Sequence, residues 1–488
     1  MQDIGTLLIR GLTLHQQGQA AQARKIYEQV LALQPNQVDA LHLLGTIYLQ
    51  EDSAQQALEL ISKALAINPH FAEAYSNKGL ALQKLKRFEE ALASHEKSIE
   101  LKPDYVAAYT NRGELLQAMG RLQEALDSHE QAIKLKPDYA LAYSNRGLLL
   151  ADLNHFDESL ASYDKALELK PDYADVYHNK SLVYLSRQDY ERGWECYEWR
   201  FKTQKQLLRF DLKLPQWQGR SSDKRLLIWG EQGVGDQVLF GGLLPELAAY
   251  AQDKQVALDG RLVPLFERSM PGLKFMDIGQ LRDANGFEEQ IAMGSLPRLL
   301  RSSRQSFEKV RSPYLVADPH RVGELRELVQ RPGKRVCGVS WSSKRGDVGQ
   351  GKSISLAQML VPLADLGLHF VNLQYGDKAE ELAALKREHG IEVQAVERVD
   401  NFKDIDGLCA LIEACDVIVT TSNTTVHLAG ALGKQTLLLL PQGRSRLWYW
   451  GEGQSRSIWY PSVSMYAQQN IGDWQHPLAE IKARLENL

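Results

Sequence analysis

Apolar and polar positions follow two different patterns along this 488-residue chain. Up to Pro171, the pattern repeats every 34 residues, and glycine, alanine and proline recur at fixed positions within it. From Arg225 onward, short strand-like runs alternate with longer helical stretches. The first pattern predicts repeated pairs of antiparallel helices, and the second predicts parallel strands that are connected by helices.

The repeat is marked by five prolines, Pro35, Pro69, Pro103, Pro137 and Pro171. Each stands 24 residues after a glycine and 12 residues after a small residue, alanine in four repeats and serine in the fifth. Small side chains are needed where two helices cross closely, and proline ends the second helix because it lacks the backbone N–H. This period is typical of tetratricopeptide (TPR) repeats, whose stacked helix pairs form a superhelix with a concave surface.

Asparagine recurs at one repeat position, as Asn77, Asn111, Asn145 and Asn179. Amide side chains both donate and accept hydrogen bonds. The row therefore predicts either bonds within and between repeats or a binding site for an extended peptide of a protein acceptor. It resembles the asparagine row of eukaryotic O-GlcNAc transferase, which favours peptide binding, although Ile9 and Leu43 occupy this position in the first two repeats.

The repeat pattern weakens after Pro171 and gives way to the strand–helix pattern. We expect a TPR solenoid over 1–207, with about five repeats and a degenerate sixth, and then a connector over 208–224. Strand-like runs follow at 225–230, 255–260, 274–279 and 290–294, and again at 335–341, 369–376, 392–396, 416–421 and 435–441. The predicted fold is an all-α TPR superhelix followed by an α/β module with two Rossmann-like lobes, 225–330 and 331–488.

Composition narrows the class of protein. The formal net charge of −4 argues against binding of nucleic acid or anionic membranes through bulk charge. The four cysteines have neither metal-ligand nor CxxC spacing. The N-terminus lacks a signal-peptide pattern, and no run approaches the ~18 apolar residues of a membrane span, so we expect a cytoplasmic protein.

The segment 230–236, Gly-Glu-Gln-Gly-Val-Gly-Asp, joins the first strand-like run to a helix. Gly233 and Gly235 allow the backbone to come close to a ligand, and Asp236 opens the helix. A carboxylate there could act as a general base toward an acceptor hydroxyl. Aspartate is also a common helix-capping residue, so both interpretations stay open.

The segment 420–430 joins another strand-like run to a helix. Free N–H groups at the helix start, with the hydroxyls of Thr424 and Thr425, make a site for a diphosphate. His427 lies one turn into the helix, where it could donate a hydrogen bond to a phosphate, although a single helical histidine is more often simply packed. We expect this helix start and the one at Asp236 to face each other.

Residues 346–353 match the P-loop pattern G-x-x-x-x-G-K-[ST]. The segment 342–345 separates this match from the preceding strand-like run, whereas a P-loop follows its strand directly. No later strand-like run ends in an acidic residue suited to bind magnesium. We therefore expect Lys352, or Lys344, to bind a diphosphate as a point charge, and an NTPase is the alternative.

Together these segments resemble the heptosyltransferase-like (family 9) glycosyltransferases of the GT-B fold, especially bacterial forms fused behind TPR repeats. The family's D-T-x-x-x-H-L-x-G phosphate loop corresponds to 422–430, where Ser422 and Asn423 replace Asp-Thr. The resemblance implies that Asp236 activates the acceptor. It implies a donor-binding set of Gly233, Gly235, Lys344, Lys352, Gln374, Asn423, Thr424 and Thr425. Trp448 and Trp450, late in the chain, either shape the sugar or acceptor pocket or belong to the core.

The resemblance implies an inverting glycosyltransferase that moves a sugar from a nucleotide-sugar to Ser or Thr of a protein held by the repeats. In function the layout resembles that of bacterial flagellin glycosyltransferases, and the resemblance makes Asp236 and His427 the catalytic candidates. We expect no metal, and no cofactor beyond the nucleotide-sugar co-substrate, because a positively charged protein site can stabilise the leaving phosphate. Transfer to lipopolysaccharide or another glycan, and a non-catalytic TPR scaffold with a vestigial transferase domain, are the alternatives.

Overall fold

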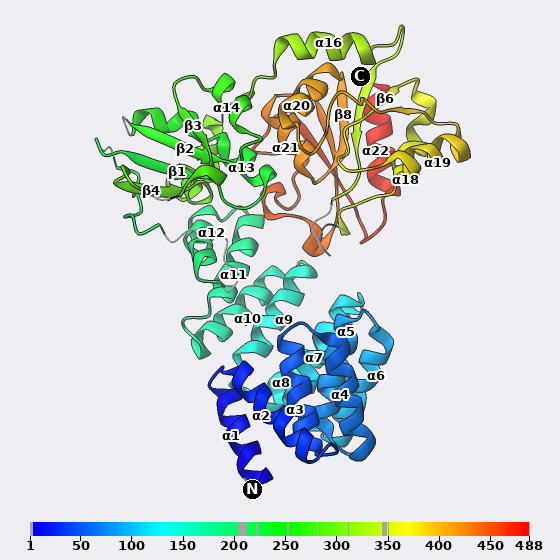
Figure 1. Ribbon diagram of the computed structural model, residues 1–488. Helices are drawn as coiled ribbons and strands as arrows, with labels where there is room; N and C mark the ends of the chain where they lie inside the picture. Colours follow the sequence, from blue (N-terminus) through cyan, green and yellow to red (C-terminus); the bar gives the residue numbers. More distant parts are fainter. Residues whose placement is uncertain are drawn as a thin grey trace. The chain divides into compact units, whose positions relative to one another are not determined.

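The computed structural model describes residues 3–203, 212–220, 223–250, 253–282, 284–310, 312–343, 349 and 351–487. The chain divides into two compact units, Met1–Val176 and Tyr177–Leu488. Figure 1 shows the helices of the first unit in blue to cyan, and the strands of the second unit from green to red. The first unit is helical, and the second holds all strands of the described residues.

The first unit consists of antiparallel helix pairs, one pair for each 34-residue repeat. The helices are α1 (Ile4–Gln16), α2 (Ala20–Leu33), α3 (Val38–Gln50), α4 (Ala54–Ile67), α5 (Ala72–Lys84), α6 (Phe88–Leu101), α7 (Val106–Ala118), α8 (Leu122–Leu135), α9 (Ala140–Asp152) and α10 (Phe156–Leu169). Each pair packs on the next, as in a TPR array. The predicted all-α repeat architecture is confirmed.

The repeat glycine of each first helix lies against a large side chain of the second helix. A Cβ atom on Gly113 would lie 2.5 Å from the His129 ring, and one on Gly147 would lie 2.7 Å from the Tyr163 ring. The repeat alanines of the second helices, such as Ala125, have no exposed surface. Small residues recur at these positions because the close-packed helices leave no room for a side chain.

A last helical pair leads into the second unit. It comprises α11 (Ala174–Ser186) and α12 (Tyr190–Tyr197), followed by the 3-10 helix η1 (Glu198–Lys202). α12 packs against α15 (Leu296–Leu300), a short helix of the first α/β lobe. We expected this degenerate sixth repeat inside a solenoid ending at 207, and most of it belongs to the same compact unit as the α/β lobes. The expected connector over 208–224 lies partly outside the described residues.

The first α/β lobe contains a four-stranded parallel sheet in the order β3-β2-β1-β4. The strands are β1 (Leu226–Trp229), β2 (Lys254–Leu258), β3 (Lys274–Asp277) and β4 (Glu289–Ala292). All four coincide with predicted strand-like runs. α13 (Val234–Gly241) follows β1, α14 (Val263–Ser269) follows β2, and the 3-10 helix η4 (Met293–Ser295) follows β4.

The second α/β lobe contains a six-stranded parallel sheet in the order β10-β9-β8-β5-β6-β7. The strands are β5 (Val336–Ser340), β6 (His369–Asn372), β7 (Val393–Gln394), β8 (Val417–Thr421), β9 (Thr436–Leu440) and β10 (Val463–Ala467). The first five coincide with predicted runs, and β10 was not predicted. The strand order reverses between β5 and β8, which is where open α/β sheets bind ligands.

Helices cover both sheets of the second unit. In the second lobe they are α16 (Pro319–Val329), α18 (Leu356–Leu360), α19 (Ala379–His389), α20 (Ile405–Ala414), α21 (Thr424–Ala431) and α22 (Gln475–Glu486). The strands β1, β5, β8 and β9 are buried along their whole length, as expected of parallel strands between helical layers. These features confirm the predicted α/β module after the helical repeats.

The segment between the two lobes is fixed to the end of α21. The backbone N of Tyr314 donates to the carbonyl of Ala431 at 3.0 Å, and Ser312 Oγ donates to the carbonyl of Gly430 at 3.1 Å. One hydrophobic cluster continues through both lobes and includes Phe240 of α13 and Val426 of α21. Among the described residues, every helix is too short or too polar to cross a bilayer.

Candidate functional site

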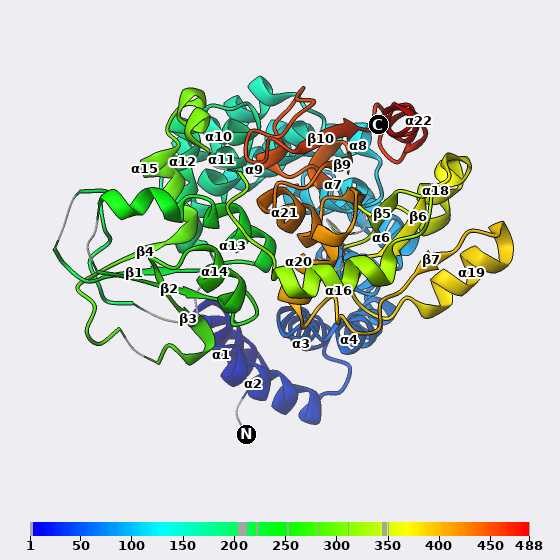
Figure 2. The same ribbon diagram turned by 90° about the horizontal axis from the view of Figure 1, so that it is seen from above.

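The helices that follow β1 and β8 pack against each other, and Figure 2 shows α13 beside α21. Gly235, in the first turn of α13, lies against the ring of His427. A Cβ atom on Gly235 would lie 3.0 Å from Cδ2 of that ring. Both helices begin at the carboxyl ends of parallel strands, one in each sheet. The packing of α13 against α21 therefore brings together the two segments singled out in the sequence, around Asp236 and around Thr424.

Asp236 occupies the third position of α13 and is half-buried. Its carboxylate accepts a hydrogen bond from the backbone N of Gly233 at 3.2 Å, as a helix-capping side chain does. Burial mainly raises the pKa values of Tyr197 and Tyr460, and the negative charge of Asp236 contributes to both. The carboxylate thus caps the helix, lies near two phenols and keeps some exposed surface.

The start of α21 is built by hydrogen bonds to β5. Asn423 Oδ1 accepts from the backbone N of Thr425 at 3.0 Å, and Asn423 Nδ2 donates to Ser340 Oγ at 2.8 Å. The Thr425 hydroxyl also lies 3.3 Å from Ser340 Oγ. Asn423 and Thr425 are buried, and Thr424 is the partly exposed residue of this helix start. Asn423 therefore shapes the site, and Thr424 remains accessible to a ligand.

The side chains of Gln374 and Ser422, which lie in the loops after β6 and β8, also form hydrogen bonds within the protein. Gln374 Oε1 accepts from the backbone N atoms of Trp341 at 2.9 Å and Ser342 at 2.8 Å. Ser422, where the resembled family has aspartate, accepts from Nε1 of Trp450 at 2.9 Å. The Gln374 bonds connect the loops after β5 and β6, and the Ser422 bond connects the loop after β8 to the segment after β9.

His427 is 2% exposed and surrounded by aromatic rings. Its Nδ1 lies 3.2 Å from the Tyr460 hydroxyl, its Nε2 lies 3.3 Å from the Tyr449 hydroxyl, and its ring stacks on Trp450. Burial, assisted by the nearby charge of Lys352, lowers the pKa of His427 to about 3. The imidazole is therefore neutral at physiological pH and has a single N–H to donate.

Lys352 is 4% exposed, and its positive charge acts on His427. A charge in a buried position acts more strongly on its neighbours than one in water. Lys344, the other expected donor-binding lysine, lies outside the described residues, as does half of the segment 346–353. The P-loop interpretation therefore stays untested.

The asparagine row bonds to the preceding repeats. Asn77 Nδ2 lies 2.8 Å from Nε2 of His42, Asn111 Nδ2 donates to Ser76 Oγ at 3.0 Å, and Asn145 Nδ2 donates to Glu114 Oε1 at 2.6 Å. These three side chains and Asn179 are half-buried. Within the described residues, Oδ1 of Asn77, Asn111 and Asn145 accepts no hydrogen bond. The bonds between repeats are thus observed, and each of these three amides retains a carbonyl oxygen that could accept from a peptide N–H.

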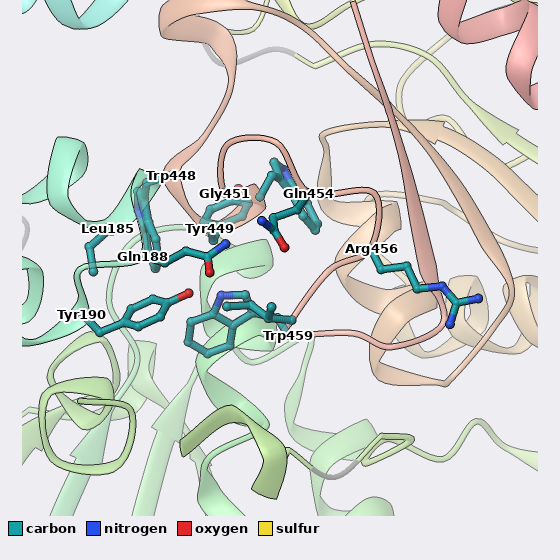
Figure 3. A pocket seen from close by; sticks show the side chains of 11 residues that line it. Leu185, Gln188, Tyr190, Trp448, Tyr449, Gly451, Gln454, Arg456 and Trp459 are labelled. Atoms are coloured by element: carbon teal, nitrogen blue, oxygen red, sulfur yellow. The ribbon is translucent and has the colours of Figure 1, made fainter. Parts of the chain in front are cut away.

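A small aromatic pocket lies where α11 and α12 meet the segment 448–459 (Figure 3). The rings of Tyr190, Trp448 and Trp459 line it together with two glutamine side chains. It has room for about one water molecule. Trp448 also packs edge-on against Trp194 of α12, with 5.2 Å between the ring centroids. Core packing therefore accounts for this tryptophan, and the pocket is too small for a sugar.

A buried ion pair that sequence reasoning missed involves Glu231, at the start of the glycine-rich loop. Nε and Nη2 of Arg200, in η1, donate to the two carboxylate oxygens of Glu231 at 2.9 and 2.6 Å. Nη2 also donates to Ser295 Oγ at 2.8 Å, and the backbone N of Gly294 donates to Glu231 at 3.0 Å. The side chains of both ionic partners are fully buried. The two residues are 31 positions apart, so no local pattern signals this pair.

The described residues contain no group of three His, Cys, Asp or Glu side chains arranged to hold a metal ion. Asp404 and Asp406 have the D-x-D spacing of some metal-dependent transferases. Each is bound by an arginine, Asp404 by Arg321 and Asp406 by Arg268. These carboxylates therefore serve ion pairs, one of which joins α14 to α20.

Comparisons with known proteins identify the repeats. Tetratricopeptide-repeat family models match residues 14–81, 70–138 and 104–172. Protein FlbA of Caulobacter vibrioides is 32% identical over 317 residues, 60% of this chain and 52% of FlbA. The chain thus spans about half the length of this curated relative. Because the match covers more residues than the first unit has, it extends into the α/β unit.

Two of the solved structures that match the repeats are described as TPR proteins. A thermophilic TPR protein from Thermus thermophilus is 25% identical and covers 38% of this chain and 100% of its own, with a TM-score of 0.35. YrrB, described as a TPR protein with an unusual peptide-binding site, is 24% identical and covers 36% of this chain and 92% of its own, with a TM-score of 0.30. The family models identify the first unit as TPR repeats, and the parallel sheets of the second unit make it an α/β module.

Proposed function

We propose that the chain binds a protein partner through its TPR repeats and transfers a sugar from a nucleotide-sugar to Ser or Thr of that partner. The observation that carries the proposal is the packing of α13 against α21. This packing places a partly exposed carboxylate, that of Asp236, near a helix start with an accessible threonine, Thr424. A base beside an anion-binding helix start suits glycosyl transfer from a phosphate leaving group.

In the proposed reaction, Asp236 accepts the proton of the acceptor hydroxyl. The hydroxyl oxygen then forms a bond to the anomeric carbon as the bond from that carbon to the donor phosphate breaks, with inversion. The electron pair of the broken bond leaves with the phosphate. The N-terminus of α21, the Thr424 hydroxyl and the charge of Lys352 stabilise the phosphate where negative charge develops.

His427 acts in this scheme as a neutral group. Its lowered pKa removes a positive charge from the imidazole, so the positive charge near α21 comes from Lys352. The ring packs against Gly235 and between tyrosine hydroxyls, which suits it to hold α13 and α21 in register. A hydrogen bond to the departing phosphate would require it to exchange one tyrosine partner for the ligand.

The protein acceptor is favoured over a glycan by the asparagine row. Carbonyl oxygens at a regular spacing suit the N–H groups of an extended peptide, which recur at a regular spacing along its backbone. Flagellin is the first acceptor to test, given the resemblance to flagellin glycosyltransferases. If the Asn111→Ala and Asn145→Ala variants transferred sugar as fast as the unchanged chain, a glycan acceptor would be favoured instead.

The transfer is tested by screening nucleotide-sugars for a thermal shift and following the acceptor protein by intact-mass measurement. Asp236→Asn keeps an oxygen for the Gly233 N–H but removes the base, so we expect kcat to fall by about 10²–10⁴ with folding retained. Asp223→Asn, at an exposed carboxylate, serves as the control and should change nothing. Activity should survive EDTA, and activity that required added manganese would contradict metal independence. Partner binding without any sugar transfer would leave the chain a TPR scaffold.

A further inference from the structure

Tyr197, the last residue of α12, and Arg200, in the 3-10 helix η1 that follows, hold the loop between β1 and α13. Arg200 binds Glu231, the second residue after β1, and the Tyr197 hydroxyl accepts from Nε2 of Gln232 at 2.8 Å. We propose that Tyr197 and Arg200 are positioning residues for Asp236, an inference that rests on the proposed role of Asp236 as the base.

All five N–H groups of Arg200 are used in this arrangement. Beyond the three bonds to Glu231 and Ser295, Nη1 donates to the carbonyl of Tyr197 at 3.1 Å and to Glu198 Oε1 at 2.8 Å. Each donor of the planar guanidinium has one acceptor, so the group can adopt a single orientation. The Glu231 carboxylate, and with it the first part of the loop, is therefore fixed relative to η1.

The loop adopts a conformation that it would not favour by itself. Gln232 has a φ of 63°, in the left-handed region that side chains other than glycine disfavour. Its neighbours on both sides are tied, Glu231 by Arg200 and Gly233 by the Asp236 carboxylate. The bond from Gln232 to the Tyr197 hydroxyl holds the disfavoured residue, so external contacts keep the loop in shape.

The position of the Asp236 carboxylate follows from the loop. Gly233, the residue after Gln232, donates its N–H to that carboxylate at 3.2 Å. A rotation of the peptide units at 231–233 would move this N–H away from the carboxylate, which would then lose the hydrogen bond that orients it. Tyr197 itself lies close to Asp236, because the negative charge of Asp236 adds to the effect of burial in raising the pKa of Tyr197. The degenerate sixth repeat thus has a task that an ordinary TPR repeat lacks, which is to orient the proposed base.

The test uses the full chain with Tyr197→Phe, which deletes one hydroxyl and keeps the ring. Tyr190→Phe is the matched control, because Tyr190 is a buried tyrosine of the same helix that contacts Phe307 and lies outside the loop network. Hydrogen exchange of the amides of 230–237 is measured in both variants. We expect about fivefold faster exchange in Tyr197→Phe, with Tyr190→Phe like the unchanged chain.

Kinetics with an active donor give a second readout. Tyr197→Phe should lower kcat about tenfold and leave KM for the nucleotide-sugar unchanged, because a misplaced base slows the chemical step without weakening donor binding. If the unchanged chain transfers no sugar, the proposed function fails, and the exchange measurement alone decides the positioning role. Exchange at 230–237 that is unchanged, or that rises equally throughout the unit, overturns the proposal.

Discussion

Two histidines of the repeats are buried without hydrogen bonds to either ring nitrogen. His95 and His129 occupy the same repeat position, against Gly79 and Gly113. Burial lowers the pKa of each to about 4, with a smaller contribution for His95 from the charge of Arg112. The same position holds Tyr27, Ile61 and Tyr163 in the other repeats, which shows that the fold needs a bulky group there and no charge.

These histidines make the repeats sensitive to acid. In the unfolded chain each of these histidines has a pKa near 6.5 and binds a proton below that pH. In the folded chain the ring stays neutral down to about pH 4. The free energy of unfolding therefore falls as the pH decreases through this window. By pH 5 the loss amounts to roughly 2 kcal/mol per histidine. Between pH 7 and pH 5, we expect the free energy of unfolding of the His95→Ile/His129→Ile double variant to fall by roughly 4 kcal/mol less than that of the unchanged chain.

Urea unfolding followed by circular dichroism measures this effect on the helices. All nine tryptophans lie in the second unit, so their fluorescence reports that unit separately. His155→Gln, at an exposed histidine, is the control and should keep the unchanged pH dependence. An equal loss of stability in the double variant and the unchanged chain would contradict the role of the buried rings.

At the proposed active site, residue types were more predictable than their partners. The glycine-rich loop and the helix start at Thr424 follow from short motifs, and their positions at strand ends follow from the alternation of strands and helices. The orientation of Asn423 toward Ser340 and the burial of His427 depend on packing between segments far apart in sequence. Such contacts have no local signal, so the sequence alone could not decide which side chains face a ligand.

Among the repeat helices, the asparagine row contributes to both stability and the proposed peptide binding, and its members differ. Asn145 donates to the half-buried carboxylate of Glu114. Burial raises the pKa of this carboxyl group, and the hydrogen bond from Asn145 partly offsets the rise. Asn111 donates to a neutral hydroxyl. Since bonds to charged groups contribute more, we expect Asn145→Ala to destabilise the repeats by about 1 kcal/mol more than Asn111→Ala.

Both substitutions should weaken capture of a partner peptide to a similar degree, because each removes one carbonyl oxygen that accepts no hydrogen bond among the described residues. Urea unfolding measures the first effect, and peptide titration measures the second. Equal stability of the two variants would show that the bond to Glu114 contributes nothing. Unchanged peptide affinity in both would assign the row to the coupling of repeats alone.

Helices and strands with strong periodicity were predicted best. Glycine and proline at a 34-residue spacing suffice to predict α1 to α10, because each repeat must bury the same face against its neighbour. The nine predicted strand-like runs all correspond to strands. β10 was missed because it follows a long aromatic segment whose rings pack in the core and obscure the alternation.

At the scale of the whole molecule, the boundary between the two compact units falls within α11, between Val176 and Tyr177. The last helical pair resembles a repeat in sequence, yet Trp194 and Tyr197 pack on Trp448 of the second lobe. Arg200 neutralises Glu231 of the first lobe. The pair therefore contacts both lobes of its own unit, and the end of the repeat pattern is a poor guide to where the chain can be divided.

This arrangement predicts that 173–488 folds and that 208–488 does not. Without Arg200, the buried Glu231 would lose its partner, which destabilises by about 3–5 kcal/mol, and apolar rings such as Phe307 would lose the α12 side chains that cover them. We expect 173–488 to unfold cooperatively by tryptophan fluorescence, near the midpoint of the full chain. The shorter piece should aggregate or lack a transition. A shorter piece with the same midpoint would contradict this prediction, because it would show that the last helical pair and Arg200 do not stabilise the α/β lobes.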